Sequence, residues 1–173
     1  MSAVNGRENS GGKVSILETG IYLAETVDNR SMQSTTGIIN RVKDVTLLYT
    51  TTNVPGRKGV RFGMRYIIGG IPRASIDMTF VVRFPSSGLY DPATGRRHVR
   101  SVHSGSRPVG VPLYREYQLE HDWEVVPGVW SFEFWHHNRK LGQQDFCVVL
   151  VPHSSDRSVD FDADDECTEE FVS

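Results

Sequence analysis

The sequence lacks several features that would place the chain in a specialised class of protein. It has no run of 18 or more apolar residues, which excludes a transmembrane helix. Only 2 cysteines occur in 173 residues, too few for a disulfide-rich scaffold. The first 13 residues carry no apolar signal-peptide segment, so the cytoplasm is the expected compartment. A chain of this length buries enough surface to fold as one domain without covalent staples.

Motifs of common enzyme classes are also missing. There is no Gly-x-Ser-x-Gly nucleophile motif and no phosphate-binding loop with a Lys-Ser/Thr pair. Ser101, His103 and Asp91 could supply a catalytic triad in principle, but any serine-rich loop beside a histidine offers the same groups. We therefore expect no catalysis and no metal or other cofactor. Five histidines keep a metal site or an enzyme as a competing hypothesis, although their spacing is not typical of ligands: His98, His103, His121, His136 and His137.

Helical periodicity is absent too, and apolar residues alternate instead. Residues 60–68 and 76–84 each carry an apolar side chain at every second position, which is typical of strands with one covered face. Further strands are expected at residues 20–26, 38–50, 98–103, 111–119, 128–136 and 144–151. Turns are expected between them, among them Asn53-Val54-Pro55-Gly56 and Asp91-Pro92-Ala93-Thr94-Gly95. The pattern predicts an all-β protein, an immunoglobulin-like antiparallel β-sandwich of 7–9 strands, with a closed barrel as the alternative.

We expect a single domain between two disordered ends. Residues 1–13 are predicted to be a flexible N-terminus, residues 14–152 the sandwich, and residues 153–173 an acidic disordered tail. The predicted core consists of inward-facing apolar side chains from several strands: Phe62, Tyr66, Phe80, Val82, Trp130, Phe132, Phe134, Phe146 and Val148.

The segment from Trp123 to Val148 resembles the final hairpin of many bacterial immunoglobulin-like domains. A Pro127-Gly128 turn starts a strand whose aromatic residues fill the sandwich, and Phe146-Cys147-Val148 lies in the closing strand. Over residues 18–150 the chain is similar to one bacterial family of uncharacterised proteins, a domain of unknown function. The shared motifs are Gly20-Ile21-Tyr22, Leu47-Leu48, residues 59–66, Phe84-Pro85, residues 91–95 and the Trp130 hairpin. This resemblance implies the sandwich fold and transfers no catalytic residue.

Arginine is concentrated in the middle of the chain, where lysine is absent from residue 61 to residue 107. Arginine favours planar, bidentate contacts with carboxylate or phosphate groups. If strands 60–68 and 76–84 are neighbours, their outward arginines share one face, and the region after Pro85 adds more. The alternative is a solvated face whose charges discourage aggregation. The candidate binding residues are Arg61, Arg65, Arg83, Arg96, Arg97, Arg100, Arg107 and Tyr114. The Pro-punctuated segment 107–114 is expected either at a sheet edge or as a crossing between sheets.

The net charge of -2 is the near-cancellation of two unlike parts. Residues 1–153 hold 18 basic and 13 acidic residues, a net +5, whereas residues 154–173 hold 1 and 8, a net -7. Two hypotheses follow for the tail: it lies along the arginines of its own body or of a second copy, or it docks on a partner as a short linear motif. Its candidate interacting residues are Asp160, Phe161, Asp162, Asp164, Asp165 and Glu166.

The two cysteines are expected to be unpaired. Cys147 lies in an apolar strand, where a small buried side chain fits. Cys167 lies among carboxylates, which raise the pKa of a thiol and make it a poor nucleophile. A disulfide between them requires the tail to fold back, and a reducing cytoplasm disfavours it.

These features predict a non-catalytic binding or assembly module. It is expected to recognise a protein partner through a sheet face, an edge or loops, with a tail that docks or regulates. The first alternative is binding of an anionic polymer, a nucleic acid or a polysaccharide, through the arginine face. The second is a histidine-based metal-binding protein or enzyme. Self-association through sheet edges is a further expectation, and association with a membrane is not expected.

Overall fold

The computed structural model describes residues 12–24, 45–151 and 167, and these form eleven strands and one short 3-10 helix. Strands β1 to β5 are β1 (Val14–Ala24), β2 (Val45–Thr50), β3 (Asn53–Gly56), β4 (Arg61–Ile68) and β5 (Ser75–Arg83). The remaining elements are β6 (Leu89–Asp91), β7 (Arg96–His98), β8 (Arg100–Pro108), β9 (Pro112–Gln118), η1 (Asp122–Glu124), β10 (Gly128–His136) and β11 (Arg139–Leu150).

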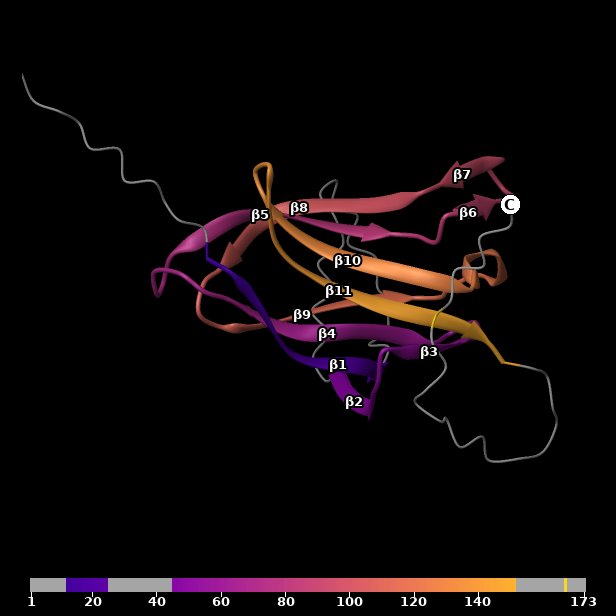
Figure 1. Ribbon diagram of the computed structural model, residues 1–173, viewed down its shortest axis with the longest axis horizontal. Coiled ribbons are helices and arrows are strands. Elements are labelled where there is room, and N and C mark those ends of the chain that lie inside the picture. The colour runs from indigo at the N-terminus through magenta and orange to yellow at the C-terminus, as the bar shows by residue number, and fades with distance from the viewer. Residues whose placement is uncertain (1–11, 25–44, 152–166, 168–173) are drawn as a thin grey trace, which may run out of the picture.

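Two sheets packed face to face make up the body of the protein, and they form the two layers of Figure 1. The four-stranded sheet has the order β2-β1-β4-β9, and the five-stranded sheet has the order β3-β11-β10-β5-β8. Strands β6 and β7 form a separate two-stranded hairpin at one end of the sandwich (Figure 1). The two sheets of the described part contain nine strands, which confirms the expected sandwich of 7–9 strands and excludes the alternative of a closed barrel.

The space between the sheets is filled by aromatic rings. Phe62 on β4 lies at the centre, with its ring centroid 5.7 Å from Trp130, 5.6 Å from Phe132 and 5.3 Å from Phe146. Tilted and edge-on contacts of this kind are favourable because the rim of one ring meets the electron-rich face of another. All nine residues expected in the core are buried, which confirms that prediction.

Several expected boundaries differ from the structure. Strand β1 begins at residue 14 rather than 20, and β8 continues to residue 108 rather than ending at 103. Asn53-Val54-Pro55-Gly56 is a strand, not a turn, and it pairs in parallel with β11 instead of antiparallel. Pro55 is tolerated there because β3 is an edge strand, where a missing N–H leaves no ladder bond unmade. Residues 38–44 of the expected second strand lie outside the described residues.

The expectation that strands 60–68 and 76–84 are neighbours is wrong. Strand β4 pairs with β1 and β9 in one sheet, whereas β5 pairs with β10 and β8 in the other. The chain crosses from the first sheet to the second between them, through residues 69–74. Successive strands of similar pattern therefore present their outward side chains on opposite faces of the molecule.

Candidate binding site at the β8–β9 edge

The eight candidate binding residues do not form one surface. Arg61, Arg65 and Tyr114 lie on the outer face of the four-stranded sheet, and Arg83 lies on the opposite face of the molecule. Arg96 and Arg97 belong to β7, Arg100 begins β8, and Arg107 lies near the end of β8. The single arginine face expected from the sequence is thus not assembled, because β4 and β5 belong to different sheets.

Both arginines on the outer face of the four-stranded sheet have carboxylate partners. Arg61 Nη1 lies 2.8 Å from Glu116 Oε1 on β9, and Arg65 Nε lies 3.0 Å from Glu18 Oε1 on β1. Tyr114 donates its hydroxyl to Glu116 Oε2 at 2.7 Å. Burial, aided by this bond, raises the pKa of Tyr114. Charges paired across strands neutralise this face and leave little to attract a polyanion.

Arg83 is engaged on the outer face of the five-stranded sheet. Its Nε donates to Glu133 Oε1 at 2.9 Å, and Glu133 also accepts from Trp135 Nε1 at 2.9 Å and lies 3.4 Å from Lys140 Nζ. Glu133 is 4% exposed, and burial alone would raise its pKa. The bonds from Arg83 and Trp135 outweigh burial and hold that pKa below its usual value.

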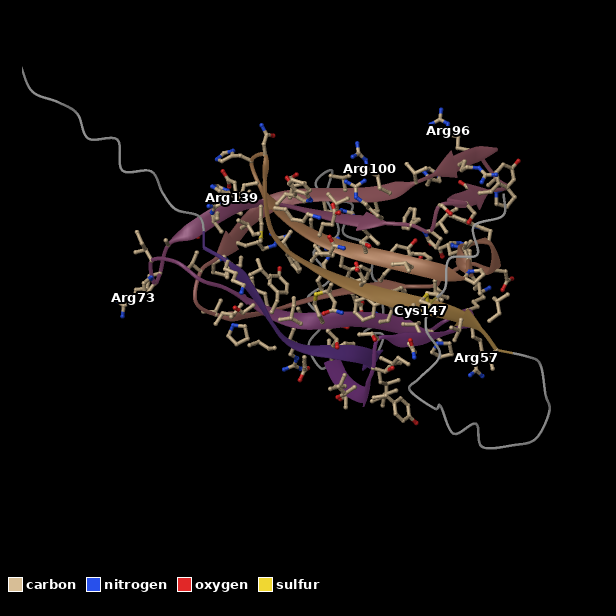
Figure 2. All side chains as sticks on the ribbon, in the orientation of Figure 1. Arg57, Arg73, Arg96, Arg100, Arg139 and Cys147 are labelled. Atoms are coloured by element: carbon tan, nitrogen blue, oxygen red, sulfur yellow. A yellow bond between two sulfur atoms is a disulfide. The ribbon has the colours of Figure 1, made fainter. Side chains whose placement is uncertain are left out.

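The remaining arginines of the expected set surround β7 and β8. Figure 2 shows Arg96 and Arg100 pointing away from the sandwich along this side. Arg97 donates to the carbonyl oxygen of Ser87. Arg107 Nη1 donates to the Ser106 carbonyl oxygen at 2.9 Å and is only partly exposed.

The two sheets end on the same side of the sandwich, in β8 and β9, and these two strands are not hydrogen-bonded to each other. The connection through residues 109–111 is a crossing between sheets, one of the two expectations for the segment 107–114. Alternate residues of both strands face the space between the sheets, as their pairing with inward residues of β5 and β4 requires. We call these inward residues the β8–β9 seam: Ser101, His103, Gly105, Arg107, Leu113, Arg115 and Tyr117.

Arg115 is the central residue of this seam and is not among the candidate binding residues predicted from the sequence. Its guanidinium carbon lies 4.2 Å from the centroid of the Phe80 ring, a cation–π contact. Its Nε atom is buried, and no group in the described part of the chain accepts a hydrogen bond from it. The sequence held a signal, because Leu113, Tyr117 and Leu119 alternate on the same side of strand 111–119 and place Arg115 in an apolar row.

Three cationic or ionisable groups meet in the seam. Burial, Arg115 and Arg107 together lower the pKa of His103 below its ordinary value of 6.5. Burial raises the pKa of Tyr66 on β4, while Arg107 and Arg115 act in the opposite direction. No carboxylate among the described residues is hydrogen-bonded or ion-paired to Arg107 or Arg115 in this cluster.

A pocket of about 260 Å³ continues the seam at the end nearer to the β6–β7 hairpin, which contributes Leu89 and His98 to its lining. Ser101 and Tyr117 belong to both the seam and the pocket. The other lining residues are largely aromatic or basic: Phe84, Leu89, His98, Arg100 and Trp123. A second hollow of about 360 Å³ lies over β5 and β8, where Thr79 and Ser104 hydrogen-bond to each other at 2.9 Å, so its polar lining is partly satisfied.

Ser101 and His103, which could supply two members of a triad in principle, do lie in contact. Ser101 Oγ lies 3.1 Å from His103 Nε2 on the inward side of β8. Asp91 is engaged elsewhere, because Thr94 Oγ1 and the Ala93 amide donate to its carboxylate at 2.8 Å each. A general base must become an imidazolium, and two nearby guanidinium groups disfavour that form. Within the described ranges, no three His, Cys, Asp or Glu side chains are grouped as metal ligands.

The expectation of two unpaired cysteines is wrong. Cys147 on β11, labelled in Figure 2, forms a disulfide with Cys167, so the chain does return to β11 after the sandwich. Cys147 lies between the inward-facing Phe146 and Val148, so its side chain is on the outer side of β11, where Cys167 can reach it. The candidate tail residues, Asp160, Phe161, Asp162, Asp164, Asp165 and Glu166, lie outside the described residues, as does most of the predicted N-terminus.

Comparisons with known proteins agree with the fold. The chain is similar to a solved immunoglobulin-like protein from Pseudomonas aeruginosa, with 23% sequence identity and a TM-score of 0.58 over 81% of this chain and 99% of that chain. No curated protein matches the chain in sequence. No helix in the described ranges has the length and apolar character of a membrane span. The family model described as "Domain of unknown function (DUF3859)" matches residues 12–148, so the chain belongs to the DUF3859 family.

Proposed function

We propose that this immunoglobulin-like domain is a non-catalytic binding module that recognises a protein partner through the β8–β9 side of the sandwich. One observation carries the proposal. On this side the inward positions of both edge strands hold polar and charged groups beside an aromatic-lined pocket, instead of a closed apolar core. Pockets that combine apolar walls with a few convergent polar groups are typical of binding sites.

The arrangement of the arginines supports a localised site over an extended polyanion surface. Arg61, Arg65 and Arg83 are paired with carboxylates on two opposite faces, so they do not line one groove. A nucleic acid or polysaccharide needs a row of free cations along its backbone. Self-association through β8 is the competing form of the same proposal, since β8 is an unpaired edge.

A photocrosslinking experiment tests the proposal. A photoreactive phenylalanine replaces Val99, which is 62% exposed between β7 and β8, and in a matched variant it replaces Tyr49, which is 67% exposed on β2. We expect a covalent adduct with a partner protein, or with a second copy, at position 99 and not at position 49. Adducts at position 49 alone, or at neither position, contradict the proposed site.

The disulfide bears on the compartment in which the module works. Disulfides between a strand and a distal segment persist in oxidising compartments and are rare where thioredoxin and glutathione act. We propose that the module works in an oxidising compartment. The cytoplasmic location expected from the sequence stays a prediction, and the disulfide argues against it. Alkylating free thiols at the moment of cell lysis tests this, because an intact disulfide leaves Cys147 and Cys167 unlabelled, whereas labelling of both supports the cytoplasm.

A further inference from the structure

The chemistry of a ligand can be inferred from Arg115. Its buried Nε–H lacks an acceptor, while Phe80 holds the guanidinium in place at 4.2 Å. A buried donor without a partner is costly, so such groups in native proteins call for an explanation. A ligand atom that accepts this hydrogen bond supplies one.

The charge around Arg115 specifies the acceptor. Arg107 from β8 and His103 from the same strand approach from the other sheet, and Tyr66 lies on β4 below them. The neighbouring carboxylate of Glu116 is on the other face of β9, where Arg61 and Tyr114 engage both of its oxygens. The seam therefore has two guanidinium groups and an imidazole with no anion assigned to them, and an oxyanion fits it.

The pocket indicates what else the ligand carries. Ser101 joins the pocket to His103 by its 3.1 Å contact, and Tyr117 lies two residues from Arg115 on the same inward face. An aromatic or apolar group in the pocket is thus adjacent to an anion at the two arginines. A peptide in which a carboxylate side chain neighbours an aromatic residue has this combination.

We propose that His103, Arg107 and Arg115 bind a carboxylate side chain of an acidic partner peptide, and that the pocket beside them takes an adjacent aromatic side chain. The proposal rests on the proposed function and names the chemistry of the partner at the same side of the sandwich. Arg115 contributes a bidentate contact through its guanidinium, and Arg107 contributes a second cation from the facing strand.

Fluorescence anisotropy with a labelled peptide tests this binding on the full chain. The probe has the sequence Asp-Phe-Asp-Ala-Asp-Asp-Glu, which occurs at residues 160–166, and a second probe carries Asn and Gln in place of the acidic residues. To remove competition in cis, the protein carries the same amide substitutions at 160, 162 and 164–166. We expect the acidic probe to bind at least about tenfold more tightly than its amide counterpart.

Matched variants distinguish specific binding at the seam from non-specific attraction between charges. Arg115→Met removes the cation while keeping a side chain that packs on Phe80, and Arg96→Met removes the same charge from the outward side of β7. We expect Arg115→Met to weaken binding of the acidic probe about tenfold and Arg115→Lys to keep part of the affinity that Arg115→Met loses. Arg96→Met should change the affinity by less than about twofold. The melting temperature of Arg115→Met should equal or exceed that of the parent, because an unpartnered buried donor is removed.

Each other outcome overturns the inference. Equal weakening by Arg96→Met and Arg115→Met identifies non-specific charge attraction. Equal affinity for the acidic and amide probes would show that the site does not recognise a carboxylate. Tighter binding of a single-stranded oligonucleotide than of the peptide would identify a nucleic-acid site instead. If no peptide binds while the adduct at position 99 persists, the acidic-peptide inference fails and the proposed function stands.

Discussion

His103 shares the inward side of the β8–β9 seam with Arg107 and Arg115, and burial and these two guanidinium groups lower its pKa. Its folded-state pKa lies below 6.5, so the folded chain binds fewer protons than the unfolded chain as the pH falls through this window. The free energy of unfolding should therefore fall on acidification below about pH 6.5 by the contribution of this histidine.

A titration of the His103 ring by NMR checks this directly. We expect a pKa below 6.5 in the parent chain and a higher value in Arg115→Met, because one of the groups that lower it is removed. His103→Gln should reduce the loss of stability in the same pH window. A parent pKa at or above 6.5 would contradict the placement of the three groups.

Glu133 also has a folded-state pKa below its ordinary value, and its effect on stability falls in a more acidic pH window. Burial favours its neutral form, but bonds from Arg83 and Trp135 lower its pKa below 4.5 in the folded state. Its stabilising contribution is therefore present above about pH 4.5 and lost as the pH falls through the folded-state pKa.

Glu133→Gln should destabilise the protein by about 1 kcal/mol at pH 7, a figure kept small because Arg83 is 48% exposed. The difference between parent and variant should shrink as the pH falls below 4.5, as measured by urea unfolding at several pH values. Asp145→Asn, on the exposed side of β11, is the control and should have little effect.

At the scale of elements, the position of β9 sets the position of Arg115, and Gly63 on β4 sets the position of β9. A Cβ atom at Gly63 would lie 2.1 Å from the carbonyl oxygen of Arg115, a backbone atom of the neighbouring strand. Gly63 also pairs with Gly20 on β1, where an added Cβ atom would lie 1.9 Å from the carbonyl oxygen of Tyr49. The close approach of the neighbouring backbones therefore excludes a Cβ atom at either glycine.

Gly63→Ala should separate β9 from β4 and lower stability by about 3 kcal/mol, with loss of probe binding at the seam. Gly69→Ala is the matched control, because its Cβ would meet Lys13 at an ordinary 3.4 Å. Thermal unfolding of the two variants compares them. Equal melting temperatures would contradict the steric role of Gly63.

Alternation along the chain was enough to predict the sandwich and its core. Phe62, Phe80 and Phe132 each lie in an alternating run, and side chains that alternate must face opposite sides of a strand. Sheet membership could not be predicted in this way. The runs around Phe62 and Phe80 have the same pattern, yet residues 69–74 carry the chain from one sheet to the other.

The candidate site was predicted only in part. The sequence places Arg107 among the arginines of the region after Pro85, and the structure shows that it lies on the inward side of β8. Arg115 could be predicted as a site residue only if β9 were known to be an edge strand facing β8. An arginine in the apolar row of a central strand would place its charge in the core. Asn53-Val54-Pro55-Gly56 has the composition of a turn, and only its pairing with β11 makes it a strand.

At the scale of the whole molecule, the disulfide joins residues that are 20 apart and ties the acidic end of the chain to the sandwich. Cys167 belongs to the segment 154–173, which carries a formal -7, and it is bonded to a body that carries a formal +5. Closing a segment of this length reduces the entropy of the unfolded chain.

Cys167→Ser should lower the free energy of unfolding by about 3 kcal/mol, the value expected for a closed segment of this size. Reduction of the parent chain should lower it by a similar amount, and the variant should be insensitive to reductant. Unfolding in urea with and without reductant measures both effects. A variant as stable as the parent would contradict a stabilising role for the bond.

The bond also makes residues 148–166 part of a covalent ring. Cleavage by trypsin after Arg157 would break the backbone once without releasing either piece. The cut chain would gain the mass of one water and still migrate as a single species until a reductant opens the ring. A module built in this way can be nicked in its acidic segment and keep that segment attached to β11.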